Sequence, residues 1–326
     1  LAFYVGIVAV ALLLRMHDLG ARALHHDESL HAVYSWKLFQ GQGYVHDPMM
    51  HGPFQFHANA LMYFLFGDND VTARLAHVLC GVGLVGLVYT LRAELGRWGA
   101  MAAAVLLAFS PSLLYFSRFS REDILFAFHT LLMISGLLGY VRTRQARWLY
   151  VGSVGLALAF STKESIYLTG FLIVTFIALY SAAEYWRTRQ SALWDLIRSV
   201  PLPVVGNCVL ITVGICVVLY TTFFTNPNGL YTGTIGALRY WAEQQGVARG
   251  GQPTYYYVLL VLLYEFLALA LAVAAVLTSV PRKRGLAVIT GLALLAAISY
   301  FVLTRPERIY LGDIEEKKGW FAIGLA

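Results

Sequence analysis

Charge is what this sequence has least of. Lys, Arg, Asp and Glu together make up 13% of its 326 residues. A soluble domain carries roughly 25% charged residues, so this scarcity excludes an ordinary water-soluble protein. Hydrophobic residues make up 59% of the chain, and its mean hydropathy is +0.64. The composition therefore predicts an all-α protein that crosses a membrane many times.

Cysteine is also rare, and its three copies, Cys80, Cys208 and Cys216, all lie inside apolar segments. We interpret them as small buried side chains and not as disulfide or metal positions. The net charge of +6 would suggest nucleic-acid binding in a soluble protein. Here most of the excess Lys and Arg lies in short connections between apolar runs, where membrane orientation explains it. We therefore expect no nucleic-acid partner.

The apolar residues form about nine runs of membrane length, which we interpret as transmembrane helices. They lie at 1–15, 71–91, 98–117, 123–141, 148–162, 167–186, 201–224, 255–280 and 286–304. The short connections richest in Lys and Arg follow the second, fourth, sixth and eighth runs. The positive-inside rule places these connections and the N-terminus in the cytoplasm. The sequence thus predicts a multi-pass protein of the cell membrane, targeted by its first helix.

The first outer connection, 16–70, is long enough to hold helices of its own. Asp27 can cap one helix, which would end at Gly41 or Gly43. A second helix should run from Pro53 to Gly67 and lie along the membrane surface, because it is too short to cross. A second large outer loop is expected at 225–253. The chain opens and ends beside apolar runs, so we expect one module, 1–326, truncated at both ends.

Counting crossings places three charged clusters, 25–28, 118–123 and 163–164, on the same outer face as the loop at 225–253. We expect these four segments to meet there. A transport path would instead need charges inside the runs. Asp27 could be only a helix cap, but a cap does not need the adjacent Glu28. A carboxylate at a dry interface has a raised pKa and can accept a proton.

The Lys and Arg side chains of these clusters could bind a phosphate. Arg118 and Arg121 could clamp a lipid phosphate, and Asp123 could hold them in place. Lys163 could place a point charge on the same group. Ordinary loop charge for the arginines and snorkelling for Lys163 are the alternative interpretations. Glu265 is an acid within a run and thus a functional candidate, unless it only pairs with a neighbouring tyrosine or helix.

Histidines crowd the first outer connection, which holds seven of the nine: His17, His25, His26, His31, His46, His51 and His57. Asp27 and His31 are four residues apart and can share a helix face, as two metal ligands would. No cysteine joins them and no tight metal-spacing pattern is present. His26, His31 and His51 are therefore only weak metal candidates. A divalent metal is possible, and no cofactor is required.

These residues, in this order, resemble membrane glycosyltransferases with the GT-C fold. The likeness is to protein O-mannosyltransferases and the aminoarabinose transferases of lipid A, and it is strongest to a prokaryotic subfamily labelled flippase activity-associated. The similar positions are His25-His26-Asp27-Glu28, Gly43-Tyr44, Pro48, His51-Gly52-Pro53, Phe66-Gly67, Arg74, Ser117-Arg118, Arg121, Asp123, Thr162-Lys163-Glu164, Tyr255-Tyr256-Tyr257 and Tyr264-Glu265. The aminoarabinose enzymes tend to have Lys-Pro-Pro where this chain has His51-Gly52-Pro53.

The resemblance implies transfer of a sugar, mannosyl, hexosyl or related, from a polyprenyl-phosphate donor on the extracytoplasmic face, with inversion. The acceptor would be a protein, a lipid or a glycan. Asp27 is the expected base, Glu28 its support or an acceptor binder, and Asp123 an orienting or acceptor-binding acid. The expected phosphate ligands are Arg118, Arg121 and Lys163. Candidate substrate contacts are His26, His51, Glu164, Tyr256 and Glu265.

Two other classes of protein stay open. A transporter or flippase-associated protein for lipid-linked sugars would need polar groups through the bilayer, and only Glu265 is a clear candidate. A structural subunit would leave the one-sided collection of charge without a cause. The sequence therefore favours an enzyme.

Overall fold

The computed structural model describes residues 1–244 and 256–279, and within these ranges all regular structure is helical. The chain forms two compact units. The first consists of Leu1–Phe109 and Leu113–Trp241, and the second of Ser110–Ser112 and Ala242–Ala326. The predicted all-α class is confirmed for the described residues.

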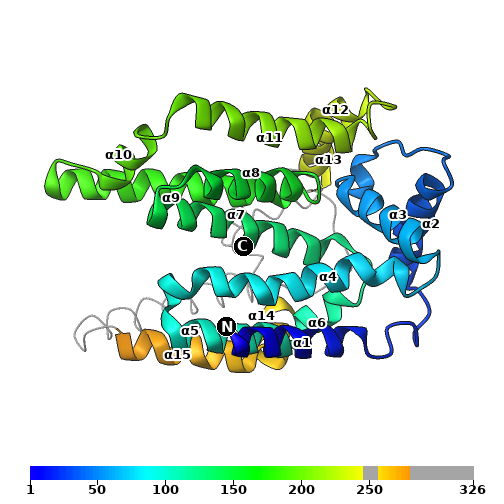
Figure 1. The fold of residues 1–326 in the computed structure, drawn as a ribbon, viewed down its shortest axis with the longest axis horizontal. Helices are drawn as coiled ribbons and strands as arrows, with labels where there is room; N and C mark the ends of the chain where they lie inside the picture. Colours follow the sequence, from blue (N-terminus) through cyan, green and yellow to red (C-terminus); the bar gives the residue numbers. More distant parts are fainter. Residues whose placement is uncertain (245–255, 280–326) are drawn as a thin grey trace, which may run out of the picture. The chain divides into compact units, whose positions relative to one another are not determined.

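The helices of the described residues follow one another along the chain (Figure 1). They are α1 (Ala2–Met16), α2 (His26–Phe39), η1 (Pro48–Met50), α3 (Phe54–Phe66), α4 (Thr72–Leu87), η2 (Val88–Leu91), α5 (Arg92–Phe109), α6 (Pro111–Ser117), α7 (Glu122–Thr143), α8 (Ala146–Phe160), α9 (Ser165–Thr188), α10 (Ala192–Arg198), α11 (Leu202–Tyr220), α12 (Gly229–Tyr231), the π-helix η3 (Thr232–Gly236), α13 (Ala237–Gln244), α14 (Tyr256–Tyr264) and α15 (Phe266–Ser279).

Four helical stretches of the described part are long and apolar enough to cross a membrane. They are Thr72–Phe109, Glu122–Thr143, Ser165–Thr188 and Leu202–Tyr220. Shorter apolar helices are Ala2–Met16, Ala146–Phe160 and Phe266–Ala275. The protein is thus a multi-pass membrane protein. The expected number of about nine spans stays a prediction, and the run at 286–304 lies outside the described residues.

The second and third predicted runs are separated from each other, and the third is divided, where the backbone requires it. Gly96 has φ 70° and ψ 166°, which breaks the helical path between η2 and the body of α5. The run expected at 98–117 divides again before Pro111, because proline lacks the N–H that would continue the helix. The helix α5 therefore ends at Phe109, and its last carbonyls need other donors.

Arg15 supplies those donors from α1. Its guanidinium is fully buried and donates to the carbonyls of Leu107 and Ala108, at 3.1 and 3.3 Å. Its Nε also donates to the hydroxyl of Ser117. An arginine inside an apolar helix is costly unless it is paired in this way. The residue therefore fixes the C-terminal end of α1 to the ends of α5 and α6.

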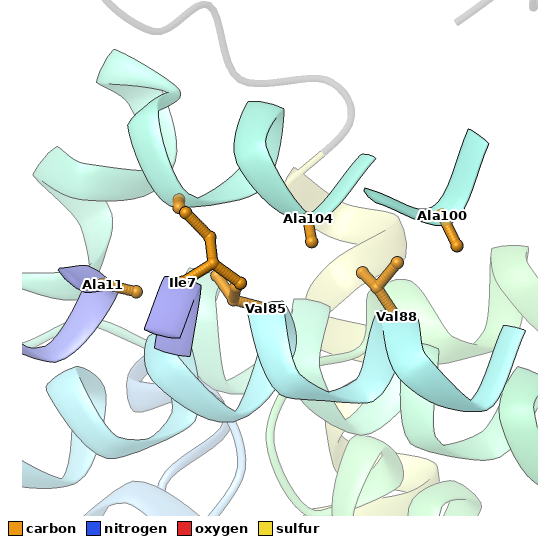
Figure 2. Close-up of a cluster of buried hydrophobic side chains, with 7 residues drawn as sticks. Ile7, Ala11, Val85, Val88, Ala100 and Ala104 are labelled. Atoms are coloured by element: carbon orange, nitrogen blue, oxygen red, sulfur yellow. The ribbon is translucent and has the colours of Figure 1, made fainter. Parts of the chain in front are cut away.

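Small side chains allow α1, α4 and α5 to pack closely (Figure 2). Their shared cluster contains the buried residues Ile7, Ala11, Val85, Val88, Ala100, Ala104 and Ala108. Lipid tails are as apolar as these side chains, so close packing rather than escape from water holds membrane helices together.

Glycine serves the same purpose between α7 and α8, which lie side by side in Figure 1. A Cβ added at Gly136 would lie 2.4 Å from the backbone nitrogen of Gly152. One added at Gly155 would lie 2.5 Å from the nitrogen of Met133. The two helix backbones are therefore in direct contact, which no larger residue permits.

The two helices expected in the first outer connection are present as α2 and α3. The prediction for α3 is confirmed, since it begins after Pro53 and ends at Gly67. The prediction that Asp27 caps α2 is wrong. The N-cap is His25, whose ring accepts from the Asp27 amide while the Glu28 carboxylate accepts from the His25 amide. This reciprocal capping leaves the Asp27 side chain available for another partner.

The first outer connection is held against the ends of α8 and α11. The amides of Gly52 and Phe54 donate to the carbonyls of Thr162 and Ser161, at 3.1 and 2.8 Å. A Cβ at Gly52 would lie 2.2 Å from the Ser161 oxygen, so only glycine fits there. The segment 51–53 is thereby placed beside Lys163.

The segment that follows α11 also contacts this connection. The ring of His46 lies 2.9 Å from the hydroxyl of Thr232, and the hydroxyl of Thr222 donates to the carbonyl of Tyr44. Parts of the loop expected at 225–253 therefore cover the first connection. The rest of that loop, 245–253, lies outside the described residues.

In the second unit, the run expected at 255–280 is divided at Glu265, which lies between α14 and α15. The Glu265 carboxylate accepts from the hydroxyl of Ser110 and from the amide of Ser112. Its described partners are thus Ser110 and the first turn of α6, which agrees with the alternative interpretation that Glu265 pairs with a neighbouring helix.

The glycine contact between α7 and α8 can be tested with two matched substitutions. Gly136→Ala should destabilise the protein by about 1–3 kcal/mol, because its methyl group must push the Gly152 backbone away. Gly170→Ala in α9 has nothing within 4 Å of the new methyl group and should be neutral or slightly stabilising. Thermal unfolding of both variants in detergent measures the difference, and equal midpoints would contradict the close contact.

Candidate active site

The site is built around Glu28, whose carboxylate is fully buried. Nε and Nη2 of Arg74 donate to it at 2.7 and 2.9 Å, and Arg22 donates at 2.9 Å. The backbone amides of His25 and Ser120 also donate to it. Burial by itself would raise the pKa of Glu28, but these donors outweigh it and lower that pKa from 4.5 to about 2.

This saturation defines what Glu28 can do. Its oxygens accept five hydrogen bonds, so the carboxylate has little capacity left for a substrate. Its low pKa also makes it a poor proton acceptor near neutral pH. The residue instead holds the first turn of α2 against α4 and against the amide of Ser120. The geometry thus makes Glu28 a structural anchor, and its role in a reaction stays a prediction.

Asp27, the neighbouring acid, points at the second charged cluster. Its Oδ2 accepts from Nη1 of Arg121 at 3.1 Å. The two side chains are 40% and 35% exposed, so the pair is reachable by a ligand. The ends of two helices far apart in sequence, α2 and α7, are brought together here (Figure 1).

The buried centre beneath this pair is Glu122, the first residue of α7 and only 1% exposed. Its Oε1 lies 3.4 Å from both His51 Nε2 and Lys163 Nζ, and 3.5 Å from Arg121 Nη2. Its Oε2 lies 3.9 Å from His31 Nε2. A carboxylate at a helix N-terminus is favoured by the helix dipole. Glu122 belongs to the charged cluster predicted at 118–123, but nothing in the sequence indicated this central position.

Two further pairs complete the arrangement. Nζ of Lys163 donates to Oδ1 of Asp123 at 2.6 Å, and Nδ1 of His51 lies 2.7 Å from Oε2 of Glu164. Lys163 is 23% exposed and Asp123 34%, whereas Glu164 is 8% exposed. All three predicted outer clusters therefore meet through side-chain contacts. We call Asp27, Arg121, Glu122, Asp123, Lys163, Glu164 and His51 the ion-pair network.

The network has more acid than base. Asp27, Glu122, Asp123 and Glu164 are opposed by two permanent cations, Arg121 and Lys163. A protonated His51 would offset part of the difference. Burial alone would lower the pKa of His51, but the contacts with Glu164 and Glu122 raise it above 6.5. The same balance of burial against Glu122 and Asp123 raises the pKa of Lys163.

Several predicted site residues lie elsewhere. Arg118 donates to the carbonyls of Leu14 and Asp18 at the end of α1 and has no described contact with the network. The expected grouping of Arg118 with Arg121 and Lys163 is therefore not what the structure forms. His26 is exposed at the start of α2.

Tyr256 and Glu265 belong to the second unit. Both stay candidates for substrate contact. Tyr255, which the resemblance also includes, lies outside the described residues.

Two of the three weak metal candidates, His31 and His51, contact Glu122, whereas His26 is exposed. Within residues 1–244 and 256–279, no group of three His, Cys, Asp or Glu side chains is arranged to hold a metal ion. His31 is buried, and burial lowers its pKa although the nearby Glu122 carboxylate opposes the shift. His51 instead bridges Glu122 and Glu164, and His26 is exposed.

In the part of the chain that the structure describes, the fold and the network define a multi-pass membrane protein with a charged site where α2, α7 and α9 begin. The sequence matches the family of dolichyl-phosphate-mannose-protein mannosyltransferases over residues 24–228, more than half of the chain. The chain belongs to this family. No curated protein matches the sequence significantly.

Solved structures agree on the fold. The apo crystal structure of ArnT from Cupriavidus metallidurans matches with a TM-score of 0.60 and 21% identity, covering 79% of this chain and 47% of ArnT. The Pmt1-Pmt2 protein O-mannosyltransferase complex of S. cerevisiae gives 0.51 and 19%, covering 72% of this chain and 34% of that one. AglB from Archaeoglobus fulgidus, an oligosaccharyltransferase, gives 0.50 and 16%, covering 93% and 37%.

These matches confirm the GT-C fold expected from the sequence. The chain spans less than half the length of these solved structures.

The anchoring role of Glu28 predicts a large loss of stability when its charge is removed. Glu28→Gln should cost about 3–5 kcal/mol at pH 7, because Arg74 would remain buried without its counter-ion. The matched control is Glu94→Gln, whose partner Arg142 is partly exposed and whose loss should cost about 1 kcal/mol or less. Thermal or denaturant unfolding distinguishes the two, and a similar small loss in both would remove Glu28 from its central place.

The lowered pKa of Glu28 also predicts a specific loss of protein stability at acidic pH. Because its folded-state pKa is depressed, its stabilisation is complete above about 4.5 and is lost as the pH falls towards 2. The wild-type unfolding midpoint should therefore fall over that window more steeply than the midpoint of Glu28→Gln. Parallel pH profiles would contradict the assignment.

The raised pKa of His51 predicts that its contribution to stability is lost at high pH instead. Its folded-state pKa is raised, so its stabilisation is complete below 6.5 and is lost as the pH rises through the higher folded-state value. The difference in unfolding midpoint between wild type and His51→Gln should thus be larger at pH 6 than at pH 9. The exposed His17→Gln is the control and should show little change. A difference independent of pH would mean that His51 does not titrate within the network.

Proposed function

We propose that this chain carries the catalytic module of a glycosyltransferase that moves a sugar from a polyprenyl-phosphate donor to an acceptor on the extracytoplasmic face. Membership of the mannosyltransferase family supports the reaction class. Two similar structures support the donor class: ArnT was solved bound to undecaprenyl phosphate, and Pmt1-Pmt2 bound to its sugar donor. The observation that carries the proposal is the Asp27–Arg121 pair. Its two side chains are partly exposed and lie beside the buried carboxylate of Glu122.

The reaction requires a base that takes the proton of the acceptor hydroxyl, and positive charge that stabilises the leaving phosphate. The acceptor hydroxyl oxygen attacks the anomeric carbon and forms the new glycosidic bond. The bond from that carbon to the phosphate oxygen breaks, and its electron pair stays on the phosphate. Asp27 takes the hydroxyl proton. Such an in-line displacement inverts the anomeric centre.

Arg121 and Lys163 are the cations that would bind the phosphate. In the ligand-free network each already has a carboxylate partner, Asp27 and Asp123 respectively. A phosphate that binds Arg121 would therefore compete with Asp27. Once Asp27 loses its ion pair, its carboxylate is free to accept a hydrogen bond from the acceptor hydroxyl. Donor binding would thus make Asp27 available to the acceptor, and the Arg121 guanidinium would link the binding of the two substrates.

The remaining roles follow from position. Asp123, 34% exposed, would hold Lys163 or share in acceptor binding. His51 and Glu164 would line the same region, with His26 at its exposed edge. Glu28 and Glu122 would hold the reacting groups in place and not touch the substrate. The surface helices α2 and α3 would wall the site towards water. The count of about nine spans and the sidedness belong to this proposal as well.

Removing the base tests the proposal directly. Asp27→Asn keeps the shape of the side chain but cannot take a proton, so transfer should fall by about 10²–10⁴-fold. Binding of the lipid-linked donor should persist, because Arg121 and Lys163 are unchanged. The measurement is transfer of radiolabelled sugar from polyprenyl-phosphate donors in membranes that contain the full protein.

Asp70→Asn is the control, since Asp70 is exposed in the turn before α4 and should leave transfer intact. Undiminished transfer by Asp27→Asn would end the assignment of the base. A lipid-flip assay in liposomes separates the transporter alternative, because an enzyme needs no flip to make product.

A further inference from the structure

A second charged site lies apart from the ion-pair network, at the C-terminal end of α1. It is a pocket of about 250 Å³, and three arginines, Arg22, Arg74 and Arg118, line it. Pockets that enclose a whole drug-sized ligand measure roughly 300–1,000 Å³, so this one suits a headgroup.

The charge of the pocket favours an anion. Arg22 and Arg74 share the carboxylate of Glu28, and one acid, Asp18, also lines the pocket, where it is 72% exposed and contacts His17. Arg118 donates only to backbone carbonyls in its described hydrogen bonds, which orient its guanidinium without neutralising it. Within the described residues, no ion pair includes Arg118. The pocket therefore keeps an excess of positive charge in a planar donor group that matches phosphate geometry.

The surroundings of the pocket are apolar. Leu19, Leu114 and Tyr115 also line it. The side chains of Leu13 in α1 and Tyr115 in α6 are 70% and 50% exposed, and most residues of these two helices are apolar. A ligand of this site would thus place a charged group among the arginines and an apolar chain along α1 and α6. Bilayer lipids have that chemistry, and basic pockets at the ends of membrane helices bind lipid headgroups.

We propose that the Arg22–Arg74–Arg118 pocket binds the phosphate of a membrane phospholipid, separately from the sugar donor. The site stands whether or not the chain transfers sugar. It would tie the lipid to the active site through one residue, because Arg74 lines the pocket and also holds Glu28. An occupied pocket would therefore stabilise the arrangement of α2 on which Asp27 depends.

Native mass spectrometry of the full chain in detergent, titrated with phosphatidylglycerol, tests the site. Arg118→Gln should weaken binding at least about tenfold, the loss expected for one charge-assisted hydrogen bond. Arg97→Gln is the matched control, an exposed arginine far along the chain from the pocket, and should change nothing. Leu114→Trp keeps every arginine and fills the pocket, so it should also weaken binding.

The competing ligands decide what the site recognises. Diacylglycerol lacks the phosphate and should bind at least tenfold more weakly than phosphatidylglycerol; equal binding would overturn the proposal. Displacement of the lipid by inorganic phosphate at equal concentration would reassign the pocket to a free anion, and displacement only by polyprenyl phosphate would make it part of the donor site. Unchanged phosphatidylglycerol binding in both Arg118→Gln and Leu114→Trp would also refute it. Asp27→Asn should keep full lipid binding, which separates this test from that of the proposed function.

Discussion

The buried pair between Glu28 and Arg74 is the interaction on which the rest of the site depends. A lone carboxylate or guanidinium in this position would be too costly to bury, but the two together, with two backbone amides and Arg22, satisfy each other. The pair connects three segments: the first turn of α2, the first turn of α4 and the turn before α7. Because those segments are fixed, Asp27 and Arg121 can remain half-exposed and still hold a defined geometry.

A division of labour follows between adjacent residues. Glu28 and Glu122 are buried and surrounded by donors, while Asp27 and Asp123 lie beside them with a third or more of their side chains exposed. The buried acid of each pair sets the position of the helix end, and the exposed acid is left to meet a ligand. This explains why paired acids occur in a chain that otherwise has so few.

The acidic excess of the network gives donor binding a physical consequence. Under the proposed function, a phosphate that enters beside Arg121 and Lys163 must displace the carboxylates of Asp27 and Asp123 from them, so donor binding would change the partners of Asp27. The pocket lined by Arg22, Arg74 and Arg118 would bind a phosphate more readily, because its lining has more cations than acids. The two charged regions thus differ in what they select, although Arg74 and Glu28 lie between them.

The sequence by itself determined the helical class, most helix positions and the meeting of three charged clusters on one side. Those features follow from local hydrophobicity and from counting crossings, which need no long-range contact. It did not determine that His25 caps α2, that Glu122 is the centre of the network, or that Arg118 faces away from Arg121. Neighbouring acids look alike in sequence. Only the tertiary structure decides which one is buried among donors and which one remains exposed, because burial and hydrogen bonding depend on segments that are remote along the chain.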